Sequence, residues 1–212
     1  MANILRNKLK IIPNAYSEEE RLKQINDVAA FCSATEDGVR RNLSFANIAP
    51  KPTGFTPESK EEDDWLLHNW GTRTRALNAC WLNDEEMIFD TFWNPPIPII
   101  KKIIENFKDI DFEYKFASKK AGTKAGEINA SGGEIISLNL FEDYSVEAYE
   151  TAFELMPHLK EQFVLSLKTN NYIYDASILN ASIEQKGFYK DEDGTILIGK
   201  KTCKNNADNL PF

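Results

Sequence analysis

Cysteine and histidine are scarce in this sequence. The 212 residues include three cysteines, Cys32, Cys80 and Cys203, and two histidines, His68 and His158. Cysteines that are odd in number and far apart fit neither a disulfide framework nor the paired spacing of a zinc or iron–sulfur site. We therefore interpret all three as buried thiols and predict no metal site and no cofactor.

Long apolar runs and recognisable catalytic motifs are also missing. No stretch reaches the apolar length of a membrane span, and residues 1–6 carry charge where a signal peptide needs an apolar core. These two features predict a cytoplasmic protein that does not contact a membrane. Because no nucleophile-elbow, Walker, dinucleotide-binding or zinc-protease pattern occurs, we predict no catalytic residue.

Basic charge is in deficit and unevenly distributed. The formal net charge is −8, which disfavours generic nucleic-acid binding because the phosphate backbone rewards clustered Lys and Arg. The acidic excess lies in residues 58–100 and 134–170, whereas residues 1–57 and 101–133 each carry a net charge of +2. A face that binds anions must therefore draw on one of these two basic segments.

Apolar residues make up 42% of the chain, and their spacing predicts the secondary structure. Alternation favours strands at 3–12, 39–48, 112–116 and 134–140 and a hairpin over 72–93. Helical spacing favours 17–32, 64–70, 97–107 and 146–156. Further strands are expected at 163–169 and 172–178, a hairpin at 187–200, and a tail over the last dozen residues.

Several finer expectations follow from the same patterns. Ser17 and Glu20 form a capping-box pair at a helix start. The acidic run 58–64 is interpreted as a solvated linker, and Arg73 and Arg75 are expected on one face of a strand. The apolar residues of the strand at 134–140, which are Ile136, Leu138 and Leu140, are expected to point inward.

Strands that alternate with helices and antiparallel hairpins indicate an α+β fold, with an antiparallel sheet and helices packed on one face. We predict a domain over residues 1–156. Residues 157–212 form a β-rich C-terminal extension that we expect to pack on the same core.

Four motifs in this order carry a family resemblance. They are Asn3 with Asn7-Lys8-Leu9, Ser-Phe-Ala-Asn-Ile-Ala-Pro-Lys-Pro at 44–52, Asn-Trp-Gly-Thr at 69–72, and Thr-Phe-Trp-Asn-Pro-Pro at 91–96. Together they resemble the YubB-like ferredoxin-fold family, proteins of unknown function found in phages, plasmids and prophages. The resemblance covers residues 1–156. Ile4-Leu5 and Arg73-Thr74 depart from the family pattern, which has Trp-Cys and Lys-Trp there, so the chain resembles a divergent member.

The resemblance implies a ferredoxin-like βαββαβ sandwich without an iron cluster and a setting on a mobile element. It carries no known catalytic residues to this chain. The sites below are therefore weighed on the residues alone.

Two tryptophans within the motifs are candidate binding residues. Trp70 and Trp93 each end a predicted element and could line a shared recess, or both could be core or corner residues whose indole N–H groups need one partner each. We favour the architectural reading for both.

One cluster of polar residues offers chemistry. His68 and Asn69 lie close in sequence to Arg73 and Arg75, which could supply acid–base chemistry or clamp a carboxylate or phosphate. The alternative is that the arginines pair with the acidic residues at 61–64. We favour this structural alternative.

A basic loop is the remaining candidate. Lys119, Lys120 and Lys124 surround two glycines, in a loop of the kind that contacts phosphates or simply forms a solvated hairpin tip. No aromatic residue is interleaved among them, so a stacking platform for single strands is not evident.

We expect a non-catalytic module that binds a protein, and a host factor in particular, because an acidic chain with aromatic-rich edges meets proteins more readily than nucleic acid. One version is mimicry of nucleic acid by a continuous acidic stripe from residues 58–64 and 142–154. An alternative is a nucleic-acid-binding accessory protein that uses the sheet face and the hairpin at 119–124. A third, least favoured, is an enzyme that uses His68 with Arg73 and Arg75.

Overall fold

The computed structural model describes residues 3–166, 168–175, 188–190 and 196–198. The chain forms two compact units, Met1–Leu159 and Lys160–Phe212. Each unit is described by itself, and the predicted packing of the C-terminal extension on the main core stays a prediction.

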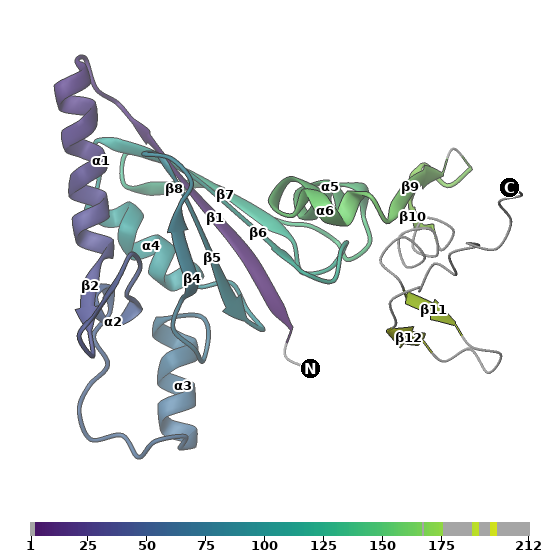
Figure 1. The fold of residues 1–212 in the computed structure, drawn as a ribbon. Helices are drawn as coiled ribbons and strands as arrows, with labels where there is room; N and C mark the ends of the chain where they lie inside the picture. The colour runs from purple at the N-terminus through teal and green to yellow at the C-terminus, as the bar shows by residue number, and fades with distance from the viewer. Residues whose placement is uncertain (1–2, 167, 176–187, 191–195, 199–212) are drawn as a thin grey trace, which may run out of the picture. The chain divides into compact units, whose positions relative to one another are not determined.

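The first unit contains an antiparallel sheet of six strands in the order β4-β5-β1-β6-β7-β8 (Figure 1). The strands are β1 (Ile4–Pro13), β4 (Leu77–Trp81), β5 (Glu86–Phe92), β6 (Ile110–Ser118), β7 (Gly126–Ser131) and β8 (Glu134–Leu140). β1 lies between β5 and β6, with Leu9 opposite Met87 on one side and Tyr114 on the other. The strand alternation seen in the sequence is thus confirmed for the central strands.

A βαββαβ unit accounts for most of this sheet. Its elements are β1, α1 (Glu18–Cys32), β4, β5, α4 (Ile97–Asn106) and β6, in chain order. Numbering these strands one to four along the chain gives the spatial order two-three-one-four, which is the ferredoxin-like arrangement. The predicted α+β fold with a ferredoxin-like antiparallel sheet is confirmed.

The hydrophobic core lies between the sheet and helices α1 and α4. Every second residue of β1 faces this core, and Leu5, Leu9 and Ile11 are fully buried. α4 contributes its four isoleucines at 99, 100, 103 and 104, all buried, and α1 contributes Val28 and Cys32. Ser17 caps α1 by accepting a hydrogen bond from the Glu20 N–H, as the capping pair predicts, while the Glu20 carboxylate accepts from the Tyr16 N–H rather than from that of Ser17.

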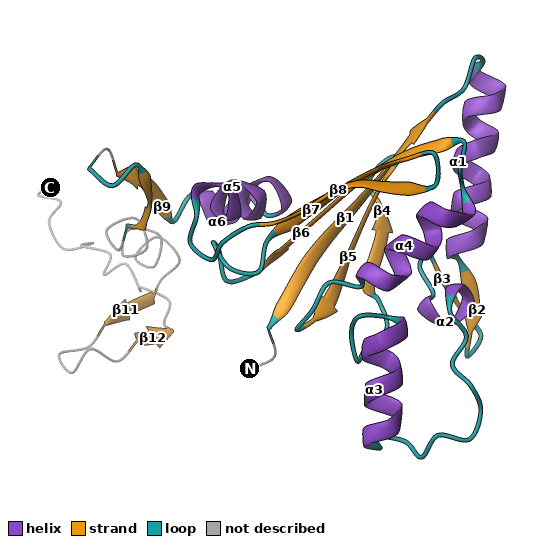
Figure 2. Ribbon diagram, turned by 180° about the vertical axis from the view of Figure 1, so that it is seen from behind, coloured by secondary structure: helices purple, strands orange, loops and turns teal. Residues whose placement is uncertain are grey.

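The opposite face of the sheet is polar, and a third helix reaches it. α5 (Val146–Leu155) packs against β6 and β1. Its Glu154 carboxylate accepts hydrogen bonds from Lys8 and Lys115, each at 2.6 Å, and these lysines point away from the core. α1 and α4 therefore share one face as predicted, while α5 lies on the other (Figure 2).

Between α1 and β4 the chain forms short elements that differ from the prediction. The expected strand over 39–48 is wrong beyond residue 41, because Ser44 caps a one-turn helix, α2 (Phe45–Ile48), by accepting from the Asn47 N–H. The strand part is β3 (Val39–Arg41), paired with β2 (Ala34–Glu36). Phe45 is buried at the centre of the core rather than placed on a ladder.

The acidic run at 58–64 is mostly helical rather than a linker. α3 (Lys60–Asn69) begins after Ser59, whose hydroxyl accepts from the Glu62 N–H. Three acidic residues in its first turn are favoured by the helix dipole, which explains why charged residues begin this helix. Arg73 and Arg75 follow in a loop, so the expected strand face that they share is also wrong.

β8 is an edge strand whose apolar side chains are exposed. Ile136, Leu138 and Leu140 have exposed fractions of 68%, 45% and 66%, so their predicted inward placement is wrong. Leu138 pairs with the buried Ile128 and shares its face, but α4 covers only the beginning of β8.

The cysteines differ from one another in exposure. Cys32 is buried as predicted, whereas Cys80 is exposed, so its predicted burial is wrong. Cys203 lies outside the described residues.

After α5 the chain continues through α6 (Pro157–Lys160) into the second unit. In that unit β9 (Phe163–Ser166) pairs with β10 (Asn171–Tyr174), and β11 (Phe188–Lys190) pairs with β12 (Ile196–Ile198). The strands expected at 163–169 and 172–178 pair with each other, and the hairpin expected at 187–200 is confirmed in its pairing. The turn at Asp193-Gly194, residues 176–178 and the expected tail lie outside the described residues. In the part of the chain that the structure describes, no helix combines the length and apolarity needed to cross a membrane.

Candidate functional site

The motif Asn-Trp-Gly-Thr at 69–72 is fastened to the motif at 91–96. Trp70 is buried and its indole N–H donates to the Ala49 carbonyl at 2.9 Å. Gly71 has φ +79, and a Cβ there would lie 2.9 Å from the Pro95 carbonyl oxygen. The Thr72 hydroxyl donates to the Phe92 carbonyl at 2.9 Å. Two motifs that are separate in sequence thus meet, and glycine is required where they touch.

Trp93 stands at the end of β5 in an uncommon conformation. Its φ is +68, which places a bulky side chain in the left-handed region that favours glycine. Its N–H donates to the Asn3 carbonyl at 2.7 Å, and its carbonyl accepts from the Lys124 ammonium group at 2.9 Å. The side chain is nevertheless 50% exposed. A strained backbone fixed on both sides therefore presents an exposed indole ring.

A hollow of about 270 Å³ lies beside this ring. It is lined by Leu67, Arg73, Phe92, Trp93 and Asn94, which we call the Trp93 corner. Three of these five side chains are apolar, and Arg73 supplies the positive charge. The shared recess expected for Trp70 and Trp93 is not what forms, because Trp70 belongs to the core and does not line the hollow.

The structure divides the polar cluster at 68–75. Arg73 forms an ion pair with Asp63 at 3.3 Å, as the structural alternative predicts, and its side chain remains more than half exposed. Asn69 donates to the Trp65 carbonyl in its own helix. His68 is exposed at the end of α3, and Arg75 lines a different hollow from Arg73. The four residues do not form one site.

The lysines of the basic loop between β6 and β7 contact residues outside the loop. Lys119 lies 3.3 Å from Asp90. Lys120 lies over the Tyr144 ring, 5.7 Å from its centroid, and a hydrogen bond with Tyr144 raises the pKa of this lysine. Lys124 reaches Trp93 as described above. The loop therefore adjoins the Trp93 corner, and each of its three lysines already has a partner.

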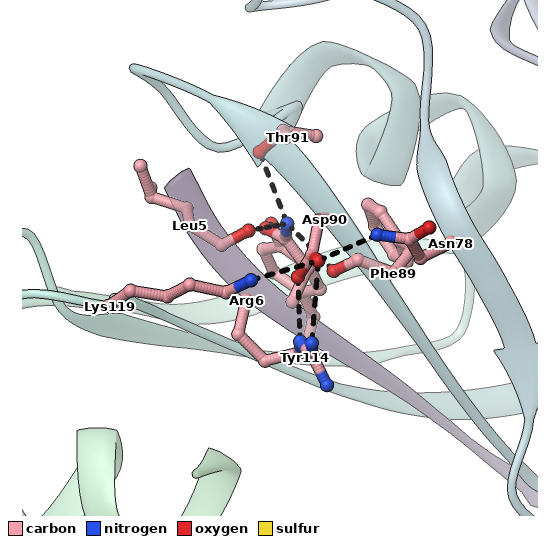
Figure 3. A network of polar contacts seen from close by, with 9 residues as sticks. Leu5, Arg6, Asn78, Phe89, Asp90, Thr91, Tyr114 and Lys119 are labelled. Carbon is pink, nitrogen blue, oxygen red and sulfur yellow. Dashed lines mark hydrogen bonds and ion pairs between the residues drawn. The ribbon is translucent and has the colours of Figure 1, made fainter. Parts of the chain in front are cut away.

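Asp90 organises the polar face of the sheet near this corner (Figure 3). Its carboxylate is 2% exposed and accepts hydrogen bonds from Arg6 at 2.6 Å and 3.3 Å and from Asn78 at 3.1 Å. Burial alone would raise the pKa of Asp90, but the hydrogen bonds and the charges of Arg6 and Lys119 outweigh burial and lower it. Asp90 is thus held as a carboxylate at neutral pH.

Asn7 organises the opposite, buried face. Its amide donates to the carbonyls of Leu5 and Phe89 and to the Thr91 hydroxyl, at 3.1 to 3.3 Å, and its oxygen accepts from the Tyr114 hydroxyl at 2.6 Å. Burial raises the pKa of Tyr114 well above its ordinary value. Thr91 in turn donates to the Asn94 carbonyl at 3.0 Å. This network holds the turn that carries Trp93.

The sequence analysis did not identify Asp90 or Asn7 as the centre of a polar network. Asp90 gave no signal, because a carboxylate in a strand is ordinary. Asn7 did give one, since it replaces an apolar residue in the alternation of Leu5, Leu9 and Ile11. A polar residue on a core face must find hydrogen-bond partners there, which marks it as the centre of a network.

Among the described residues, no three His, Cys, Asp or Glu side chains lie close enough together to hold a metal ion. Arg73, Trp93 and the lysines of the loop suit binding, because their side chains offer apolar area and positive charge. The corner offers exposed contact surface rather than a paired nucleophile and base.

Comparison with known proteins bears on the fold. Residues 69–158 match the family model described as the ferredoxin-like domain in Api92-like protein. The match supports the ferredoxin-like fold and includes β4, β5, α4 and β6 of the βαββαβ unit, whereas β1 and α1 lie before residue 69. The match includes the motifs at 69–72 and 91–96 and the basic loop. The name YubB-like and the mobile-element setting stay predictions.

One solved structure is similar over part of its length. It is a crystal structure of protein Api92 from Yersinia pseudotuberculosis, 15% identical, with a TM-score of 0.36. The alignment covers 50% of this chain and 43% of that chain, so the similarity spans less than half of that protein. No curated protein matches this chain significantly.

Proposed function

We propose that this chain is a non-catalytic protein-binding module that presents the Trp93 corner to a protein partner. The main observation in support is that Trp93 is half exposed although hydrogen bonds fix its backbone N–H and carbonyl. Tryptophan and arginine are enriched among the residues that dominate interface energies, and both are present at this corner. The hollow beside Trp93 would receive an apolar side chain of the partner.

Pre-organisation supports this assignment. A side chain that is already fixed loses little conformational freedom on binding, so more of its contact energy appears as affinity. The backbone of Trp93 is restrained before any partner arrives, and the left-handed φ that it adopts is tolerated only because the surrounding contacts impose it. If Trp93 had only an architectural role at the end of its strand, burial of its ring would stabilise the fold more than exposure does.

Nucleic-acid binding is the second candidate, and a specific observation favours it. Lys124 bonds the Trp93 carbonyl, so the basic loop and an exposed aromatic ring are adjacent, a pairing that suits single strands. Against it, each of the three lysines already has a partner that competes with a phosphate for its ammonium group. The sheet face offers little more, because Arg6, Lys8 and Lys115 are paired with carboxylates there.

Mimicry of nucleic acid by acidic faces receives no support from the geometry. α3 carries the run at 58–64 and packs with α4 on the core side of the sheet, whereas α5 contacts the opposite face (Figures 1 and 2). The two acidic runs therefore lie on different sides of the sheet. The proposed partner is instead a cytoplasmic host protein, as the mobile-element resemblance implies, bound through the Trp93 corner.

The test compares proteins captured by three tagged forms of the full chain from a lysate of its native cells. The forms are wild type, Trp93→Gly and Tyr16→Ala, each with and without nuclease. Tyr16 is a fully exposed aromatic residue before α1 and serves as the matched control. We expect a nuclease-resistant protein that wild type and Tyr16→Ala capture equally and Trp93→Gly loses.

Binding of that protein is then measured by calorimetry with both purified components. Truncation of a central anchor costs at least about 2 kcal/mol in binding, or roughly thirtyfold in Kd. Capture that is unaffected by Trp93→Gly would contradict the proposal. Capture that disappears with nuclease would favour the nucleic-acid alternative.

A further inference from the structure

A second hollow, unrelated to the Trp93 corner, lies at the opposite strand edge of the ferredoxin-like sheet from β8. Its volume is about 310 Å³, and it is bounded by β3, the segment after it, and the edge strand β4 with the residues before it. Three arginines line it: Arg40, Arg41 and Arg75. None of its lining residues, all of which are described, is acidic.

The three guanidinium groups differ in whether they have an ion-pair or hydrogen-bond partner. Arg41 Nε lies 2.9 Å from Glu36 Oε2, but without the alignment of a hydrogen bond. Glu36 also accepts from the Ser44 hydroxyl. The Arg40 and Arg75 side chains are exposed, and neither guanidinium forms a hydrogen bond or ion pair with any residue in the described part of the chain. Two arginines whose guanidinium groups have no partner among the described residues and one paired arginine therefore line the same concave surface.

The backbone around the hollow is irregular. β4 departs from regular pairing between Leu77 and Cys80, and Asn78 between them has φ +53. Asn78 turns its amide to Asp90 on the neighbouring strand. Asn42 donates to the Ala79 carbonyl at 3.1 Å and ties the segment after β3 to this irregular edge. Such irregularities at a sheet edge re-aim side chains and end pairing, as is common beside binding sites.

We propose that this hollow binds the phosphate group of a small phosphate ester. Guanidinium groups pair bidentately with phosphate oxygens, and several of them can address one dianion from different sides. A small ligand is favoured over a nucleic-acid strand, because the chain carries a net charge of −8 that repels a long polyanion. The local excess of positive charge is confined to one pocket-sized surface.

This site was only partly foreshadowed in the sequence. Arg75 was a candidate for clamping an anion, and residues 1–57 were one of the two segments able to supply an anion-binding face. What the sequence could not show is that Arg75 lines the same hollow as Arg40 and Arg41, more than thirty residues earlier, and not that of Arg73.

The test titrates ¹⁵N-labelled full-length protein with inorganic phosphate, adenosine monophosphate, acetate and a single-stranded oligonucleotide at low ionic strength. Shifts of backbone amides near Arg40 and Arg75 locate the bound anion, and their concentration dependence gives Kd. The Arg40→Gln/Arg75→Gln double variant removes the two unpaired cations. The Lys101→Gln/Lys102→Gln double variant removes two exposed charges from α4 and serves as the matched control.

We expect phosphate and adenosine monophosphate to bind wild type and the control alike, and the arginine variant to bind roughly tenfold or more weakly. Thermal unfolding of each variant verifies that the fold is retained, which the exposure of both arginines favours. Acetate binding as tight as phosphate, or an unchanged Kd in the arginine variant, would overturn the proposal. Tighter, salt-sensitive binding of the oligonucleotide would identify a nucleic acid as the occupant and overturn the small-ligand assignment.

Discussion

Asn7 lies on the core face of β1, between side chains that are fully buried and apolar. It is itself fully buried, and four neighbouring polar groups depend on its amide. Its removal leaves the Tyr114 hydroxyl without its acceptor in a site closed to water. Such unsatisfied groups carry their whole desolvation cost.

Asn7→Ala is therefore expected to lower the free energy of unfolding by about 2 to 4 kcal/mol, from lost hydrogen bonds and the cavity together. Urea denaturation of the purified protein measures the change. Asn139→Ala, at an exposed position on β8, is the control and should shift it by less than about 0.5 kcal/mol. Equal effects at the two positions would refute the role assigned to Asn7.

The backbone of Trp93 leads to a prediction that separates stability from binding. Glycine adopts φ +68 without the cost of about 1 to 2 kcal/mol that an L side chain incurs. Trp93→Gly gains this relief and loses only the packing of a half-exposed ring. Its free energy of unfolding is expected to stay within about 1 kcal/mol of wild type.

Trp93→Val should be less stable than Trp93→Gly by at least about 1 kcal/mol, because β-branched residues are poorly tolerated at positive φ. The measurement is again urea denaturation of both variants. If valine were as stable as glycine, the backbone at residue 93 would not be fixed in the left-handed region.

Asp90 provides the pH dependence. Its pKa is lowered in the folded protein, so it contributes stability above its unfolded pKa, which lies near 3.9, and that contribution is lost as pH falls through the lower folded value. We expect the free energy of unfolding to fall in wild type as the pH drops below about 4, with a smaller slope in Asp90→Asn. An identical slope in both proteins would show that Asp90 is not the titrating group.

At the scale of elements, strands were easier to predict than the segments between them. Alternation over Leu5, Leu9 and Ile11 specifies a half-buried strand, and prolines with glycines bound the helices. The one-turn helix α2 was not predicted, because four residues are too few to show a helical period. The signal for its start is its cap, Ser44. Arg73 and Arg75 were predicted on a strand because the alternation of polar and apolar residues in β4 extends to the residues before it. Tertiary contacts instead hold those residues in a loop.

β8 shows the limit of the same reasoning. Alternation of Ile136, Leu138 and Leu140 correctly indicates a strand, but period two does not say whether another element covers it. That depends on sheet order, and β8 is at the edge. The candidate site had the same dependence, since Trp93, Arg73 and Lys124 come together only through long-range pairing.

An exposed apolar edge strand promotes association. Apart from Glu134 at its start, β8 has no charged residue and no proline. Leu138→Lys should reduce concentration-dependent scattering, because a charge on an edge opposes strand-to-strand pairing. Leu82→Lys, at an exposed leucine in the β4–β5 turn, is the control. Equal reduction by both variants would point to net charge rather than to the edge.

At the scale of the whole molecule, the first unit carries two separate surfaces that we propose as binding sites. The Trp93 corner combines an exposed ring with an apolar hollow, whereas the hollow at β4 gathers arginines. The family motifs at 69–72 and 91–96 mainly fasten the scaffold to itself. Within them, Trp93 is the residue whose exposure exceeds what an architectural role requires.

The most direct test of protein binding at this corner is site-specific photo-crosslinking in native cells. A benzophenone amino acid replaces Trp93 in one form of the chain and Tyr16 in another, and the crosslinked products are identified by mass spectrometry. We predict a discrete protein adduct from position 93 that is absent from position 16. Crosslinks to nucleic acid alone, or the same protein adducts from both positions, would contradict the account.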